Sequence, residues 1–253
     1  MDEKIQKLQE YVDEAEKIVF FGGAGVSTES GVPDFRSEDG LYHQKYKYPP
    51  EVILSHSFYR SKTKEFYDFY FDKMLVDEIG PFADPSNEIK PNKAHVKLAE
   101  MERAGKLTAV VTQNIDGLHQ KAGAKNVYEL HGSIHRNYCE NCKKFFDSGY
   151  MLKHKQDGVP KCDACGGDIK PDVVLYEEGL NQKTISEAVN KIAEADLLII
   201  GGTSLTVYPA AGLIDYFRGK HLVLINRSET QRDSGADLVI SDSIGEVLGQ
   251  IRL

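Results

Sequence analysis

The chain has 253 residues, of which 41% are hydrophobic and 28% charged, and its formal net charge is −8. This length suits one large domain or a large domain with a small companion. Non-specific binding to nucleic acid or to an anionic membrane needs a cationic surface, so the acidic balance argues against both partners.

The amino-terminal stretch MDEKIQKLQEYVDEAEK places apolar residues at helical spacing, which predicts an amphipathic helix over residues 2–17. The stretch lacks the continuous apolar core of a secretory signal. No later stretch approaches the ~18 uninterrupted apolar residues that a membrane-spanning helix needs. We therefore expect a cytoplasmic protein.

Short apolar strands alternate with helices along most of the chain. We expect strands at Ile18–Phe21, Leu107–Thr112, Val127–Leu130, 172–175, Leu197–Ile200, 222–225 and 237–240. We expect helices at 92–104, 115–122, 184–194, 209–217 and 244–250. Fully apolar strands separated by helices predict an α/β fold in which helices cover both faces of a parallel sheet.

Two stretches interrupt this alternation. Residues 40–90 are rich in aromatic and turn residues, and residues 135–170 contain all four cysteines of the chain. We interpret both as insertions in one large domain, which then consists of residues 1–39, 91–134 and 171–253.

The cysteines form two C-x-x-C pairs, Cys139 with Cys142 and Cys162 with Cys165. In a reducing compartment this pattern indicates a metal site rather than disulfides. Four thiolates fill all four positions of a tetrahedral zinc ion and leave none open, so we expect one structural zinc ion. Four unrelated free cysteines are the alternative. Because zinc ribbons can also bind nucleic acid, a non-catalytic binding module is a further alternative.

Glycines follow the first expected strand, in the stretch FFGGAGVSTESGVPDFR. Glycines at such a place let backbone N–H groups approach a diphosphate, and a helix N-terminus adds positive potential. The dinucleotide pattern G-x-G-x-x-G is incomplete, however, because Ser27 and Thr28 follow Gly25, and the acidic residue expected about 20 residues on is missing. A tight turn without a ligand therefore remains an alternative.

Polar side chains also follow three other expected strands. They are Gln113, Asn114 and Asp116 in VVTQNIDGLH, Thr203 and Ser204 in IIGGTSLTVYPA, and Asn226 in LVLINRS. Strand ends that converge on polar or glycine loops predict a ligand crevice at the carboxyl edge of a parallel sheet.

Taken in order, these motifs resemble those of the sirtuins, the NAD-dependent protein-lysine deacylases, in their bacterial type. The matching stretches are GAGVS, GVPDFR, TQNIDGLH, the pair His131–Gly132, the two C-x-x-C pairs, PDVV and GTSL with its continuation VYPA. The resemblance runs from residue 18 to past residue 240. It implies a Rossmann-like sheet covered by helices, with a small zinc-ribbon module and a helical insertion.

The resemblance implies NAD as co-substrate and assigns residues to it. Ile115 and Asp116 would bind the nicotinamide carboxamide, and Gln113 and Asn114 the adjacent ribose. The other residues assigned by match are Ala24, Thr28, Phe35 and Arg36 in the loop that closes over the cofactor, and Thr203, Ser204, Asn226 and Ile244 around the adenosine half.

His131 and Asn114 are the catalytic residues that the resemblance implies. In the family chemistry, the acyl-lysine oxygen attacks the anomeric carbon of the nicotinamide ribose and expels nicotinamide, and His131 then acts as general base on a ribose hydroxyl. Histidine suits this role because its reference pKa of ~6.5 leaves much of it neutral at physiological pH. Hydrolysis yields deacetylated lysine and O-acetyl-ADP-ribose. A core histidine without catalytic role is the alternative.

Acetylated proteins or peptides are the implied substrates, held as an added strand beside KPDVVLYEEGLNQ, with Val173 and Val174 as walls of the acyl-lysine tunnel. The family most often has Phe-Gly-Glu where this chain has Tyr-Glu-Glu at 176–178. A carboxylate in place of glycine near the peptide groove leads to the hypothesis of a preference for lysine-rich peptides.

Members that prefer succinyl or malonyl lysine carry Tyr-x-x-Arg in the helical insertion. The nearest equivalent is Tyr70-x-x-Lys73, and lysine lacks the bidentate fork of arginine. We therefore expect uncharged acyl groups, chiefly acetyl.

Three other functions remain open: an ordinary NAD-dependent dehydrogenase, a mono-ADP-ribosyl transferase on the same scaffold, and a zinc-ribbon binding protein with a degenerate pocket. The working expectation for the assembly is a monomer. We expect His95 and His119 to pack or to cap helices, and we do not expect His135 to bind the metal.

Overall fold

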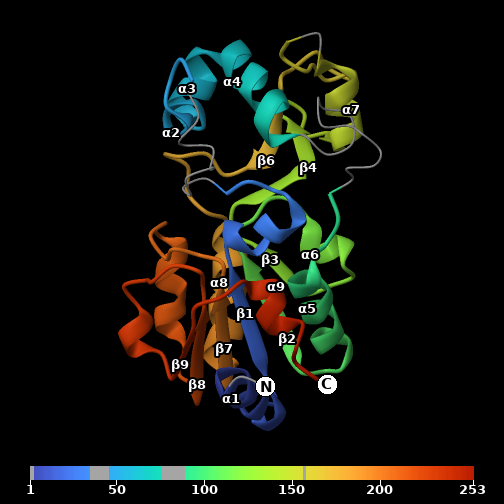
Figure 1. Ribbon diagram of the computed structural model, residues 1–253. Coiled ribbons are helices and arrows are strands. Elements are labelled where there is room, and N and C mark those ends of the chain that lie inside the picture. Colours follow the sequence, from blue (N-terminus) through green and yellow to red (C-terminus); the bar gives the residue numbers. More distant parts are fainter. Residues whose placement is uncertain (1–2, 35–45, 76–88, 156–157) are drawn as a thin grey trace.

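The computed structural model describes residues 3–34, 46–75, 89–155 and 158–253. Within these ranges the strands form a six-stranded sheet, in the lower part of Figure 1, and a three-stranded sheet in the upper part. The large sheet is parallel throughout, as expected, and its strand order is β3-β2-β1-β7-β8-β9. These strands are β1 (Ile18–Gly22), β2 (Leu107–Thr112), β3 (Val127–Glu129), β7 (Leu197–Gly201), β8 (His221–Ile225) and β9 (Leu238–Ile240).

The strand order reverses direction between β1 and β7. After β1 the chain adds β2 and β3 on one side, and after β7 it adds β8 and β9 on the other. In open parallel sheets, ligands bind beyond the carboxyl ends of the strands at such a switch point. The fold therefore predicts a binding site beyond the ends of β1 and β7.

Both faces of the large sheet are covered by helices, because every residue of β1 and β7 is buried. Phe20 packs in one hydrophobic cluster and its neighbour Phe21 in another, since successive side chains of a strand point to opposite faces. The first cluster includes residues of α1 (Glu3–Glu14), α5 (Lys93–Arg103) and α9 (Ile244–Leu248). The second includes residues of α8 (Gln182–Glu194) and of η7 (Ala210–Tyr216).

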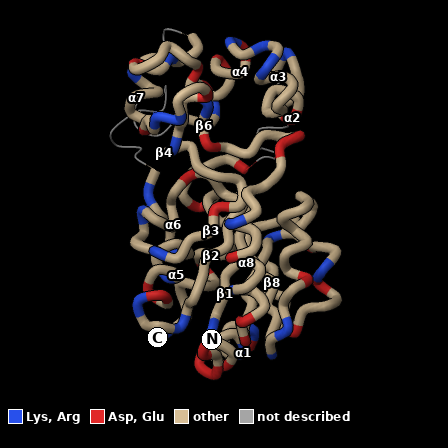
Figure 2. The backbone as a smooth tube through the Cα atoms, turned by 180° about the vertical axis from the view of Figure 1, so that it is seen from behind, with Lys and Arg blue, Asp and Glu red and all other residues tan. Residues whose placement is uncertain are grey.

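The small sheet and the helical insertion share a third hydrophobic core, and both lie above the large sheet in Figures 1 and 2. The antiparallel sheet consists of β5 (Phe145–Phe146), β4 (Gly132–Cys139) and β6 (Ile169–Val173), next to α7 (Ser148–Lys153). The insertion contains α2 (Pro50–Ile53), α3 (His56–Ser61), α4 (Thr63–Phe69) and the π-helix η4 (Tyr70–Met74).

The strand expected at 172–175 differs from the structure in place and in partner. It forms as β6, at Ile169–Val173, and it pairs antiparallel with β4 rather than joining the large sheet. Gly132 pairs with Val173, so the small sheet extends beyond the limits of 135 and 170 expected for the cysteine insertion. The partner of an isolated apolar strand depends on distant residues, which local sequence patterns do not reveal.

The other differences are local. The helix expected at 115–122 is reduced to α6 (Leu118–Lys121), because Gly117 has a left-handed φ of 71° and Asp116 accepts a hydrogen bond from Leu118 N. The helix expected at 209–217 forms as the 3-10 helix η7. Within the described ranges, the short 3-10 helices η1 (Ala24–Val26), η2 (Thr28–Ser30) and η8 (Asp233–Gly235) were not expected.

Among the described residues, every helix is too short or too polar to cross a membrane. Figure 2 shows Lys and Arg interspersed with Asp and Glu over both parts of the molecule.

Two histidines, His95 and His119, are buried side by side. His95 belongs to a capping box with Asn92 at the start of α5, and its ring lies 4.7 Å from that of His119. The expectation that both pack or cap is confirmed. Neither ring nitrogen of His119 has a hydrogen-bond partner in the described part of the chain. Burial lowers the pKa of His95 to about 4, and burial together with the neighbouring His95 lowers the pKa of His119 to about 3.

We expect these histidines to make the fold sensitive to mild acid. Unfolding returns each pKa to about 6.5, so the unfolded chain binds more protons below that pH and the free energy of unfolding falls as the pH drops from 6.5 towards 4. Between pH 7 and pH 5, His119 alone would remove about 2 kcal/mol. Urea denaturation at pH 7 and pH 5 measures the free energy of unfolding of the original chain and of His119→Phe. We expect a smaller fall between the two pH values in the variant, and an equal fall in both proteins would contradict the prediction.

Candidate active site

Glycines bring the loops after β1 and β7 into direct contact. Gly25 N donates to Gly202 O over 2.8 Å, and a Cβ on Gly25 would lie 2.8 Å from Gly202 Cα. Gly202 has φ +60°, and a Cβ there would lie 2.3 Å from Val26 N. Only glycine fits both positions, so the absence of side chains lets the two loops pack backbone against backbone at the carboxyl edge of the sheet.

Gln113 connects β2 to both of these loops. Its backbone N donates to Gly22 O over 2.9 Å, and its Nε2 donates to Thr203 Oγ1 over 3.0 Å. Thr203 N in turn donates to Asn226 Oδ1 over 2.9 Å. The Nδ2 of Asn226 is buried without a hydrogen-bond partner among the described residues. A buried donor of this kind fits a ligand oxygen, such as a ribose hydroxyl.

A buried polar cluster lies behind the segment after β2. Ser27 Oγ donates to Asp116 Oδ2 over 2.7 Å and accepts from Asn114 Nδ2 over 3.0 Å. His95 Nε2 lies 3.4 Å from the same hydroxyl. Because Asn92 N donates to His95 Nδ1, the proton of the neutral ring is on Nε2 and points to Ser27. These bonds orient Asn114 and Asp116.

Ser27 was not assigned a role from the sequence, although it is 1% exposed and contacts both Asn114 and Asp116. One feature of the sequence could have pointed to Ser27. It is a hydroxyl residue just after the glycine loop, at the place where the sequence departs from the pattern G-x-G-x-x-G. His135 also acts here, since its Nε2 donates to Asp116 O over 3.0 Å.

His131 lies where the chain passes from the large sheet to the small one. Its Nδ1 is 3.0 Å from Gln113 O, an acceptor, so the ring carries its proton on Nδ1 and leaves the lone pair on Nε2. Burial lowers the pKa of His131 below 6.5, although the bond to Gln113 O opposes the shift. The ring is therefore neutral at pH 7, in the form that can accept a proton.

Gly132 makes the turn after His131 possible. It has φ +78°, and a Cβ there would lie 1.8 Å from Asp172 O. Val174 N donates to His131 O over 2.9 Å, so the structure brings Val173 and Val174 next to the histidine.

The remaining expected residues vary in their placement. Ala24 and Thr28 lie in the loop after β1, where Thr28 Oγ1 donates to Gly25 O. Ser204 Oγ is 2.8 Å from Thr206 Oγ1. Ile115 packs at the edge of the third core, and Ile244 is buried in the first, so only its backbone can reach a ligand. Phe35 and Arg36 lie outside the described residues.

The four cysteine Sγ atoms lie within 4.8 Å of one another. The distance is 3.4 Å between Cys139 and Cys165 and 3.6 Å between Cys142 and Cys162. Sulfur atoms around a tetrahedral zinc ion are separated by about 3.8 Å, from a Zn–S distance of about 2.3 Å. The donor set therefore fits one structural zinc ion.

Comparison with known proteins identifies the family. The sequence model of the Sir2 family matches residues 23–209. The chain belongs to the Sir2 family. It is 60% identical to an NAD-dependent protein deacetylase of Clostridium acetobutylicum, over 97% of each chain, and 42% identical to one of Staphylococcus aureus, over 98% of each chain.

Solved structures of Sir2 proteins are similar to this chain over nearly its whole length. One, from work on the mechanism and regulation of Sir2 enzymes, is 37% identical with a TM-score of 0.85, and covers 99% of this chain and 96% of its own. Another, Sir2 with a p53 peptide and NAD+, is 38% identical with a TM-score of 0.81. The match covers 97% of this chain and 95% of that structure's chain. The resemblance to the sirtuins and the expected fold class are thereby confirmed.

Removing the metal should unfold the upper part of this Sir2-family chain. Cys139 and Cys162 are buried in the core that joins the small sheet to the helical insertion, so we expect loss of zinc to destabilise both. Thermal melting followed by circular dichroism, with and without a strong zinc chelator, measures this. Cys162→Ser should reproduce the loss, and an unchanged melting temperature after verified zinc removal would contradict it.

Proposed function

We propose that this chain is an NAD-dependent protein-lysine deacetylase, which transfers the acetyl group of a modified lysine to the ADP-ribose part of NAD. The reaction consumes NAD and water and releases nicotinamide, O-acetyl-ADP-ribose and deacetylated lysine. The observation that carries the proposal is the position of His131, which contacts the NAD-loop residue Gln113 on one side and the segment at Val174 on the other.

NAD supplies the activated sugar carbon, and the residues of the chain bind and orient it. The glycine loops at Gly25 and Gly202 would accept the diphosphate against the backbone. Thr203, Ser204 and Asn226 would bind the adenosine half, and the unpartnered Nδ2 of Asn226 supports this. Gln113, Asn114, Ile115 and Asp116 would hold the nicotinamide end, because Ser27 and His135 fix the loop that carries them.

His131 would act as the general base through Nε2. The bond from Nδ1 to Gln113 O fixes the tautomer, and the lowered pKa keeps the ring neutral. A neutral imidazole beside the sugar can accept the proton of a ribose hydroxyl. Asn114 would orient the reacting ribose, since its amide is held by Ser27 Oγ.

The acyl group that best fits the chain is acetyl. The Tyr70 side chain is 1% exposed and packs in the third core. Lys73 pairs with Asp72 over 3.0 Å. Neither residue is arranged to bind the carboxylate of a succinyl or malonyl group. This supports the proposed preference for uncharged acyl groups.

The proposal includes a cytoplasmic location, which a zinc site of four thiolates favours because such thiolates persist in a reducing compartment. A monomer stays a prediction. The incomplete dinucleotide pattern disfavours a dehydrogenase, whereas mono-ADP-ribosyl transfer remains compatible with the same pocket.

One assay tests the function and separates these alternatives. Protein, NAD and an acetyl-lysine peptide should yield free nicotinamide and deacetylated peptide in equal amounts. His131→Ala should lower deacetylation by about 10²-fold or more, because it removes the base, while NAD binding persists. Full activity of the variant would contradict the proposed role. Nicotinamide without deacetylation would indicate transferase or glycohydrolase activity, and formation of NADH would indicate a dehydrogenase.

A further inference from the structure

The segment 174–178, which follows β6, connects the candidate active site to the helical insertion. At one end, Val174 N donates to His131 O over 2.9 Å. At the other, Tyr176 N donates to Leu54 O and Tyr176 O accepts from His56 N, both over 2.9 Å. The position of this short segment relative to His131 therefore depends on its attachment to the start of α3.

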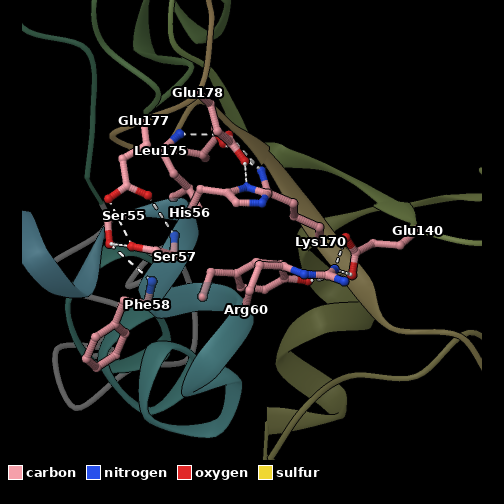
Figure 3. A network of polar contacts seen from close by, with 12 residues as sticks. Ser55, His56, Ser57, Phe58, Arg60, Glu140, Lys170, Leu175, Glu177 and Glu178 are labelled. Carbon is pink, nitrogen blue, oxygen red and sulfur yellow. Dashed lines mark hydrogen bonds and ion pairs between the residues drawn. The ribbon is translucent and has the colours of Figure 1, made fainter.

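Glu177 occupies a backbone position that suits glycine. Its φ is +75°, in the left-handed region that non-glycine residues rarely adopt because Cβ is crowded there. Such a conformation persists only where other contacts stabilise it. The Glu177 carboxylate makes these contacts: it accepts hydrogen bonds from Ser57 N and from Ser57 Oγ, each over 2.9 Å (Figure 3).

Glu178 reinforces the attachment. Its Oε1 lies 2.8 Å from His56 Nδ1, and its Oε2 accepts from Leu175 N over 2.9 Å and from Lys170 Nζ over 3.2 Å (Figure 3). Burial raises the pKa of Glu178, but these hydrogen bonds and the charge of Lys170 outweigh it and the pKa is lowered. The carboxylate therefore stays ionised and bound.

The other side of α3 is held by the zinc module. Arg60 donates to Glu140 over 3.1 Å (Figure 3). Tyr59 also donates to Glu140, over 3.0 Å, and Glu140 lies between the first two cysteines in the sequence. With α3 fixed in this way, its bonds to Glu177 fix the segment 174–178 in turn.

We propose that Glu177 is a positioning residue for the peptide substrate. The carboxylate of Glu177 holds the segment 174–178 against α3 and so keeps Val173 and Val174 in place beside His131. This inference rests on the proposed function. It differs from the hypothesis that the carboxylate attracts lysine-rich peptides, because both glutamates bind groups of their own chain. Its effect therefore extends to peptides of any charge.

Three variants test the proposal. Glu177→Ala removes both bonds and keeps the strain, Glu177→Gly removes both bonds and relieves the strain, and Glu177→Gln keeps an acceptor oxygen. Glu51→Ala, which removes an exposed carboxylate of α2 in the same insertion, is the matched control. We expect the Ala and Gly variants to raise the KM for an acetylated peptide about tenfold, with kcat and the KM for NAD within about twofold. The Gln variant should stay within about threefold of the original chain.

The pair Glu177→Ala and Glu177→Gly separates positioning from stability. The Gly variant should melt at the higher temperature of the two, because it relieves the strain. A positioning role gives both variants the same raised KM. A peptide KM that follows the melting temperature, or that does not change in either variant, overturns the proposal.

Peptides with basic and with acidic flanks separate positioning from charge attraction. An equal rise in KM for both supports the proposal, and a rise for the basic peptide alone overturns it. Fluorescence anisotropy of a labelled acetyl-lysine peptide gives the same comparison without turnover. A chain that binds this peptide but does not deacetylate it contradicts only the proposed function.

Discussion

Gln113 is the residue at which the two parts of the molecule meet. Its backbone N binds the end of β1, its side chain binds Thr203 after β7, and its carbonyl oxygen accepts the Nδ1 proton of His131. Three separate segments are thus bound to one residue. These bonds fix the positions of the glycine loops and of His131 relative to the segment that carries Asn114 and Asp116.

The polar side chains near Gln113 are costly to bury, and most of them have hydrogen-bond partners within the protein. Ser27 links Asn114, Asp116 and His95, so the hydrogen bonds that orient these side chains form within the protein itself. Preorganised groups lose little entropy when they act, which is what binding and catalysis require. The segment 174–178 is held in a similar way, because the carboxylates of Glu177 and Glu178 bind residues at the start of α3.

Local patterns were sufficient for much of the large sheet. β2 has the limits expected from its apolar run, and the polar residues after three strands do converge at one edge. Contacts between distant segments were not visible in the same way. The pairing of β6 with β4, the burial of Ile244 and the role of Ser27 each depend on residues far along the chain. Glu177 resembled a free carboxylate until its bonds to Ser57 were known.

The central claim is that Gln113 fixes His131 as a neutral ring with its proton on Nδ1. Nitrogen-15 NMR of histidine-labelled protein at pH 7, with His131→Ala used to assign the signals, measures this state directly. The account predicts a protonated Nδ1 and an unprotonated Nε2 for His131. A proton on Nε2 alone, or on both nitrogens, would contradict it.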